Sequence, residues 1–114
     1  MFYTSNTEDF QKVLDGITIK TLVYGEKMLL SEFHMDKGSR LPMHSHPQEQ
    51  CGRLIRGKIL LTVGTEQSEM APGDCWNVPG GLEHGAEILE DSVAVEVFSP
   101  VREDYLKYLP KNSA

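Results

Sequence analysis

Hydrophobic and polar residues alternate along several short runs of the chain, and this period of two predicts β-strands. Turn signals rich in glycine and proline separate the runs, as at Pro72-Gly73 and Pro79-Gly80-Gly81. Many short strands at this spacing are typical of a closed barrel or a sandwich, and not of alternating strands and helices. The strand-like runs are Ile17–Tyr24, Lys27–Met35, Leu54–Ile55, Ile59–Val63, Cys75–Val78 and Ser92–Phe98.

Two segments near the ends of the chain favour helix. In Thr7–Leu14, Thr7 is a candidate N-cap, and the two acidic residues after it suit the positive end of a helix. Val101–Leu109 places its apolar residues along one helical face. The sequence shows no repeat, low-complexity tract or linker. Residues 1–114 are therefore expected to form one all-β domain with a short N-terminal helical turn and a short C-terminal helix.

Charge and hydropathy exclude several classes of protein. The chain has 11 Lys and Arg against 17 Asp and Glu, a formal net charge of −6, which argues against a nucleic-acid partner. No apolar run approaches the ~20 residues that span a bilayer, and the first residues do not form a signal peptide. A cytoplasmic protein without a membrane partner is expected. Cys51 and Cys75 form no CxxC pair, so both are expected to be free thiols packed as small apolar groups.

Histidines supply the first candidate chemistry. His44 and His46 are two residues apart, so in an extended segment they project to the same side, together with Gln48 and Gln50. Two imidazoles and a carboxamide on one face form part of a ligand set for a divalent metal. His84 follows a tight Pro-Gly-Gly turn that would bring it back toward this face. For the histidine pair alone, an ordinary surface loop beside two prolines is an equal alternative.

The spacing of these residues resembles the two sequence motifs of the cupins. Gly38-x5-His44-x-His46-x3-Gln50-x6-Gly57 resembles the first motif, with Gln50 where cupins usually have glutamate. Gly73-x5-Pro79-x-Gly81-x2-His84, within residues 73–88, resembles the second. The resemblance implies a small double-stranded β-helix, or jelly-roll barrel, that commonly dimerises, so a homodimer is expected. It also implies one divalent transition metal per chain (Zn, Ni, Mn, Fe or Cu) with the ligands His44, His46, Gln50 and His84.

The run Ser92–Phe98 has two alternative orientations. The simpler one turns its three valines inward and leaves Glu96 exposed. The other turns Glu96 and Phe98 inward, where a carboxylate beside an apolar ring suits a general acid or base. Arg102, four residues further on, would then contact a substrate carboxylate through a bidentate pair of hydrogen bonds.

Within the cupins, the segments HSHPQEQ and VFSPVREDYL resemble pectin-degradation cupins of the KdgF type. Those proteins help convert 4,5-unsaturated uronates from the cyclic to the linear keto form. The resemblance implies catalytic roles for Glu96, where that family usually has Asp, and for Arg102. It implies substrate contacts from Phe98 and Arg102, and Gln48, on the same face as Gln50, is expected to join them. The expected ligand is a small anionic carbohydrate.

The sequence leaves three further points undecided. With iron in the same site, the chain would be a small cupin dioxygenase, and without turnover it would be a metal-dependent binding module or sensor. Lys20 and Arg40 are either positive charges around an acid-binding pocket or ordinary surface charges. Trp76 either packs in the core or lines the barrel interior.

Overall fold

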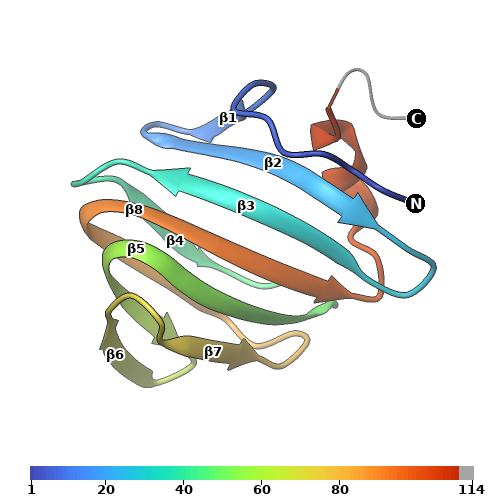
Figure 1. Ribbon diagram of the computed structural model, residues 1–114. Coiled ribbons are helices and arrows are strands. Elements are labelled where there is room, and N and C mark those ends of the chain that lie inside the picture. Colours follow the sequence, from blue (N-terminus) through green and yellow to red (C-terminus); the bar gives the residue numbers. More distant parts are fainter. Residues whose placement is uncertain (111–114) are drawn as a thin grey trace.

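The computed structural model describes residues 1–110, and its strands form the predicted all-β barrel (Figure 1). Within these residues the elements are β1 (Gln11–Leu14), β2 (Ile17–Tyr24), β3 (Leu29–Met35), β4 (Arg40–His44), β5 (Glu49–Val63), β6 (Glu66–Met70), β7 (Cys75–Val78), β8 (His84–Ser99) and the 3-10 helix η1 (Glu103–Tyr108). None of the helices in the described part is long and apolar enough to cross a membrane.

The strands pair antiparallel in the order β1-β2-β3-β8-β5-β6, with β4 added to β8 and β7 added to β5. Strands β5 and β8 are long because each serves two parts of the barrel, and Figure 1 shows them crossing it side by side. Two runs predicted as separate strands are therefore one element, β5. It bends at Gly57, which has a φ of +97° and where a Cβ would overlap the backbone and hydroxyl of β8.

The helical turn predicted for Thr7–Leu14 is wrong. Residues Gln11–Leu14 form strand β1, which pairs antiparallel with β2. The edge of β2 offers unpaired backbone groups, whereas a helix of eight residues is marginal on its own in water. The predicted C-terminal helix is present as η1, within the range expected for it.

The apolar core fills the barrel on the inner faces of the strands. Helix η1 packs Tyr105 and Tyr108 against it and is tied to the barrel by two hydrogen bonds. The Thr21 hydroxyl donates to the Tyr105 carbonyl at 2.6 Å, and the Gln11 amide donates to the Lys107 carbonyl at 3.1 Å. The core consists of Ile17, Ile19, Phe33, Met35, Leu54, Ile59, Ala86, Ile88 and Ala94.

Strand β8 corrects the simpler expectation for its orientation. Glu96 and Phe98 are buried on the inner face, while the three valines between them and beside them are half-buried on the outer face. Both faces of this part of the strand are apolar, so the sequence period alone did not distinguish them. The two cysteines, Cys51 and Cys75, are free as expected but exposed, not packed in the core.

Candidate metal centre and its cavity

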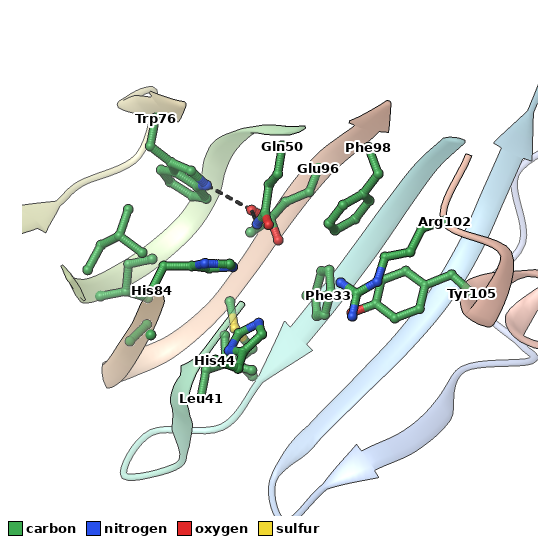
Figure 2. Close-up of a pocket in the computed structure, with 16 residues that line it drawn as sticks. Phe33, Leu41, His44, Gln50, Trp76, His84, Glu96, Phe98, Arg102 and Tyr105 are labelled. Atoms are coloured by element: carbon green, nitrogen blue, oxygen red, sulfur yellow. Dashed lines mark hydrogen bonds between the residues drawn. The ribbon is translucent and has the colours of Figure 1, made fainter. Parts of the chain in front are cut away.

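Three histidines meet at one end of the barrel. His44 ends β4 and lies opposite His84, the first residue of β8, while His46 lies in the connection from β4 to β5. One ring nitrogen from each lies within 4.8 Å of the others. Figure 2 shows His44 and His84 facing the same cavity. The sequence motifs therefore bring together the three predicted imidazole ligands.

Backbone carbonyls fix the tautomer of each of these histidines. A carbonyl oxygen only accepts hydrogen bonds, so each Nδ1 bonded to one carries the proton and each Nε2 presents a lone pair. The Nε2 of His84 is buried and has no hydrogen-bond partner among the described residues. Three converging lone pairs, one of them without a partner, form a cluster that could hold a metal ion. The acceptors are Pro42 for His44 at 2.8 Å, Gln48 for His46 at 3.0 Å and Leu82 for His84 at 2.9 Å.

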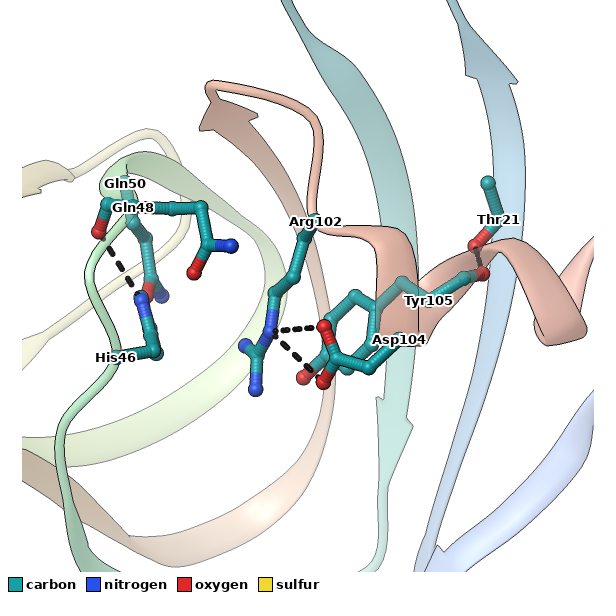
Figure 3. Close-up of polar contacts among 7 residues, drawn as sticks. All are labelled: Thr21, His46, Gln48, Gln50, Arg102, Asp104 and Tyr105. Atoms are coloured by element: carbon teal, nitrogen blue, oxygen red, sulfur yellow. Dashed lines mark hydrogen bonds and ion pairs between the residues drawn. The ribbon is translucent and has the colours of Figure 1, made fainter.

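Gln50, the fourth predicted ligand, lies beside the histidine cluster. Its Nε2 donates to Glu96 Oε1 at 2.5 Å, which turns its Oε1 toward Nε2 of His46 at 2.9 Å. Figure 3 shows Gln50 beside His46. With the His46 proton on Nδ1, these two facing atoms are both acceptors, and a positive ion beside them removes the repulsion. Three imidazoles and one amide oxygen suit a divalent transition metal such as Zn, Cu, Fe or Ni. The residues present therefore fit the implied metal.

Burial keeps two of the histidines in the neutral form that binds metal. It lowers the pKa of His84 to about 4, and it lowers the pKa of His46 as well. The positive charge of Arg102 acts in the same direction on both. At neutral pH these imidazoles are therefore available as ligands without losing a proton first.

Glu96 lies in the wall of the same cavity, with only 7% of its surface exposed. Its Oε1 accepts two hydrogen bonds, from Gln50 Nε2 and from Trp76 Nε1 at 2.7 Å (Figure 2). Burial raises the pKa of the Glu96 carboxyl, while these two hydrogen bonds and nearby Arg102 act in the opposite direction. A buried carboxyl whose pKa is raised in a cavity is a candidate for proton transfer.

Arg102 faces the cavity from the side of η1. Its guanidinium lies 3.9 Å from the ring centroid of Tyr105 and 5.1 Å from that of Phe98. Nε donates to the two oxygens of Asp104 at 3.2 and 3.3 Å (Figure 3), while the terminal nitrogens bond to none of the described residues. The half-buried side chain of Gln48 lies between Gln50 and Arg102 in the same view. An arginine held this way offers its free nitrogens to an anion.

The cavity between these groups has a volume of about 50 Å³, and it is lined by apolar side chains together with the polar residues already described. The two other cations considered from the sequence do not reach it. Lys20 is buried on the outer side of the sheet, where its ammonium donates to the backbone and side chain of Asn6. Arg40 is exposed and pairs with Glu87. Arg102 is therefore the cation that lines this cavity.

Trp76 is a cavity residue whose position the sequence did not resolve. It lies on the inner face of β7 and lines the cavity, where its indole binds Glu96. A signal was present in the sequence, because Gly52 removes a side chain from a strand that otherwise alternates regularly. Without the strand pairing, that signal did not indicate which residue fills the space.

Residues 31–100 match the cupin domain family, and the chain therefore belongs to the cupins. Among solved structures it is similar to KdgF from Halomonas sp., with a TM-score of 0.86 and 29% identity over 91% of this chain and 96% of that one. Pectin degradation protein KdgF of Dickeya dadantii (strain 3937) is 24% identical over 107 residues, which cover 92% of this chain and 97% of that protein. The resemblance to KdgF-type cupins is confirmed.

A further structural relative supports the fold. An RmlC-like cupin from Shewanella frigidimarina NCIMB 400 has a TM-score of 0.86 and 23% identity, over 91% of this chain and 94% of that one. The jelly-roll barrel expected from the sequence is thus confirmed by the strand pairing and by structural relatives.

Proposed function

We propose that this protein is a metal-dependent enzyme that opens the ring of a small 4,5-unsaturated uronate and converts it to the linear keto form. The observation that carries the proposal is that the buried Glu96 and the partly buried Arg102 line the same cavity as His44, His84 and Gln50, three of the four proposed metal ligands. Similarity to two proteins named KdgF, one of them a pectin degradation protein, supports an acidic sugar as the substrate.

Each residue of the cavity has a role in this proposal. A divalent transition metal held by His44, His46, Gln50 and His84 would act as a Lewis acid toward a substrate oxygen. Arg102, oriented by Asp104 and stacked on Tyr105, binds the substrate carboxylate through its free terminal nitrogens. Phe98 and Gln48 complete the substrate contacts. The volume of about 50 Å³ suits the reacting part of a small molecule rather than a polymer.

The proposed reaction is an isomerisation in which no atom is gained or lost. The hydroxyl at the anomeric carbon loses its proton, and the bond from that carbon to the ring oxygen breaks to leave an aldehyde. The released enolate takes a proton at C4 and becomes the ketone. The chemistry therefore needs one group that accepts and returns a proton, and Glu96 is the buried carboxyl in reach of the cavity.

The first experiment measures metal per chain on protein purified without a histidine tag, and then the loss of enol absorbance from an unsaturated uronate. The wild type should bind about one metal and accelerate the loss. Glu96→Gln should keep the metal and lose about 100-fold or more in rate, because it removes the proton acceptor. Arg102→Ala should mainly raise KM. Glu87→Gln and Arg40→Ala are matched controls, because both residues are exposed and paired with each other.

Metal binding without acceleration in the wild type would reject the uronate as substrate. The dioxygenase and the ligand-binding module predicted as alternatives would then be tested next. A wild type that binds no metal even after reconstitution would reject the assignment of the four ligands.

We also propose that the protein is a homodimer formed through the outer side of β2 and β3. Met1 and Phe2 are fully exposed, and a groove of about 830 Å³ lies between the N-terminal residues and these strands. A second copy that fills this groove would cover apolar surface. Light scattering should give twice the chain mass for the wild type, and a monomer at all concentrations would contradict the proposal. The cytoplasmic location stays a prediction.

A further inference from the structure

We propose that Trp76 is the positioning residue that fixes Glu96, and that Gly52 makes this contact possible. The inference deepens the proposed function, and it rests on that function for its kinetic consequence alone. The contact itself is a property of the fold and is tested separately.

Trp76, Gly52 and Glu96 lie in a row across three neighbouring strands. In the register of β5, Gly52 is opposite Trp76 on β7 and opposite Glu96 on β8. The indole must therefore cross the middle strand to reach the carboxylate. It does so over Gly52, where an added Cβ would overlap the indole nitrogen and Cε2. Any side chain at this position would push the indole away from Glu96.

The contact leaves one carboxylate oxygen free. Trp76 Nε1 donates to Oε1 at 2.7 Å, and Gln50 donates to the same atom. The other oxygen, Oε2, accepts no hydrogen bond from the described residues. An indole N–H is a donor only, so it always presents a proton to Oε1. The free oxygen Oε2 is thus the one that exchanges a proton with the substrate.

A glutamate needs this support because it has more torsional freedom than an aspartate. Gln50 alone is a flexible partner that also faces His46. The rigid indole, held in β7, restricts the Glu96 carboxylate to one orientation. Misplacement of a catalytic group by about 1 Å costs on the order of 100-fold in rate. Loss of the Trp76 contact should therefore slow the reaction more than it weakens substrate binding.

The first test uses the fact that the chain has one tryptophan, which gives a single indole N–H peak in a ¹H–¹⁵N spectrum. Glu96→Ala should move this peak and speed its exchange with deuterium by about tenfold or more, as expected for loss of a hydrogen bond to a charged group. Glu87→Ala, an exposed residue of the same strand, should leave it unchanged. An unchanged peak in Glu96→Ala would overturn the contact.

The second test separates positioning from binding. Trp76→Phe keeps a ring but removes the donor, and should lower kcat by about 10- to 100-fold, with KM changed less than about twofold and metal per chain unchanged. Gly52→Ala should have the same kinetic effect while keeping the tryptophan. Gly25→Ala is the matched control, because a Cβ there meets no atom within 4 Å and its φ is not positive.

Circular dichroism and metal content establish that each variant is folded. Folded, metal-loaded Trp76→Phe with unchanged kcat would overturn the positioning role. If the wild type itself does not turn over an unsaturated uronate, the proposed function fails, and the spectrum still decides whether Trp76 fixes Glu96.

Discussion

Gln50 links the histidine cluster to the Glu96 carboxylate through one amide. Its oxygen faces His46 and its nitrogen donates to Glu96. The acceptor end of the amide therefore points to the histidines, and the donor end points to the carboxylate. A glutamate at this position, which is usual in cupins, would place two carboxylates in contact inside the barrel. Two like charges at this distance do not both ionise without a large energetic cost. The amide is therefore the side chain that suits a buried acid at position 96.

The hydrogen bond from Gln50 to Glu96 predicts the effect of Gln50→Glu. In metal-free protein at pH 7 the substitution should lower the free energy of unfolding by about 2 kcal/mol or more, because the new carboxyl must either bind a proton that it lacks in the unfolded chain or repel Glu96. The double variant Gln50→Glu with Glu96→Gln should recover most of the loss, because the hydrogen bond then runs in the opposite direction. Urea unfolding measures both. Gln48→Glu, two residues away and half-buried, is the control, and an equal loss there would contradict the prediction.

His84 makes the stability of the metal-free protein depend on pH. Burial lowers its pKa in the folded state to about 4, from a usual value of 6.5, so folding favours the neutral form. The unfolded chain then binds more protons, and the stability present above pH 6.5 is lost as the pH falls toward 4. The loss should be about 3 kcal/mol. Urea unfolding of chelated protein at several pH values measures it.

The comparison that isolates His84 is the variant His84→Gln. This variant should lose less stability over the same pH range, because a glutamine does not titrate. If acidification weakens the variant and the wild type equally, the buried histidine is not the cause.

At the scale of the elements, the bend in β5 lets one strand form part of the site and part of the remaining barrel wall. Gly57 has a positive φ, and a side chain there would overlap Ser92 and Asp91 of β8. The register of β5 against β8 shifts on either side of this residue. The glycine therefore lets β5 pair with β7 near the site and with β6 beyond the bend.

Gly57→Ala should destabilise the protein by about 2 kcal/mol or more, since it combines backbone strain with a steric overlap. The thermal unfolding midpoint measures the effect. Gly25→Ala, with open space around its Cβ, should stay within about 0.5 to 1 kcal/mol of the wild type. Equal midpoints for the two variants would show that the bend does not require glycine.

The sequence predicted which residues form the histidine cluster, but it did not predict the orientation of Glu96 beside them. The physical reasons differ between the two. His44, His46, Gln50 and His84 lie in the two motifs that resemble those of the cupins, and the structure brings the three histidines together with Gln50 beside His46. The orientation of Glu96 depends on what covers each face of β8, which no local pattern records.

The prediction of an N-terminal helix was wrong for a related reason. Residues Gln11–Leu14 pair with the edge of β2, although the local sequence has a candidate cap and favourable charges for a helix. Pairing partners distant in sequence decided both this segment and the position of Trp76 beside Glu96. Tertiary contacts therefore overrode local preference at each of these points.

For the whole molecule, metal binding and folding should be coupled. The three histidines lie on two strands and a connecting loop, so the binding site exists only when the barrel is closed. A ligand that binds only the folded state at 100 times its Kd adds about 2.7 kcal/mol of stability. For a chain of this size that corresponds to an unfolding midpoint higher by about 10 °C or more.

Chelation should therefore lower the midpoint of the wild type by this amount and leave His84→Ala nearly unchanged. Differential scanning calorimetry with and without chelator measures the shift. His34→Ala controls for loss of a histidine, because His34 lies outside the cluster and pairs with Glu32. A wild type that is insensitive to chelator would contradict the coupling.

The even-numbered residues of β8 from His84 to Phe98 are buried except for Glu90, which is exposed, and Glu96 lies twelve positions after His84 on the buried face. Chain length between these two residues is therefore constrained in steps of two. Loss or gain of one residue between them would turn the carboxylate to the outside while the metal ligand stayed in place. Related proteins in which this strand differs in length by two residues should thus keep both His84 and the carboxylate in the cavity. Those that differ by one residue should keep the histidine cluster and lose the carboxylate.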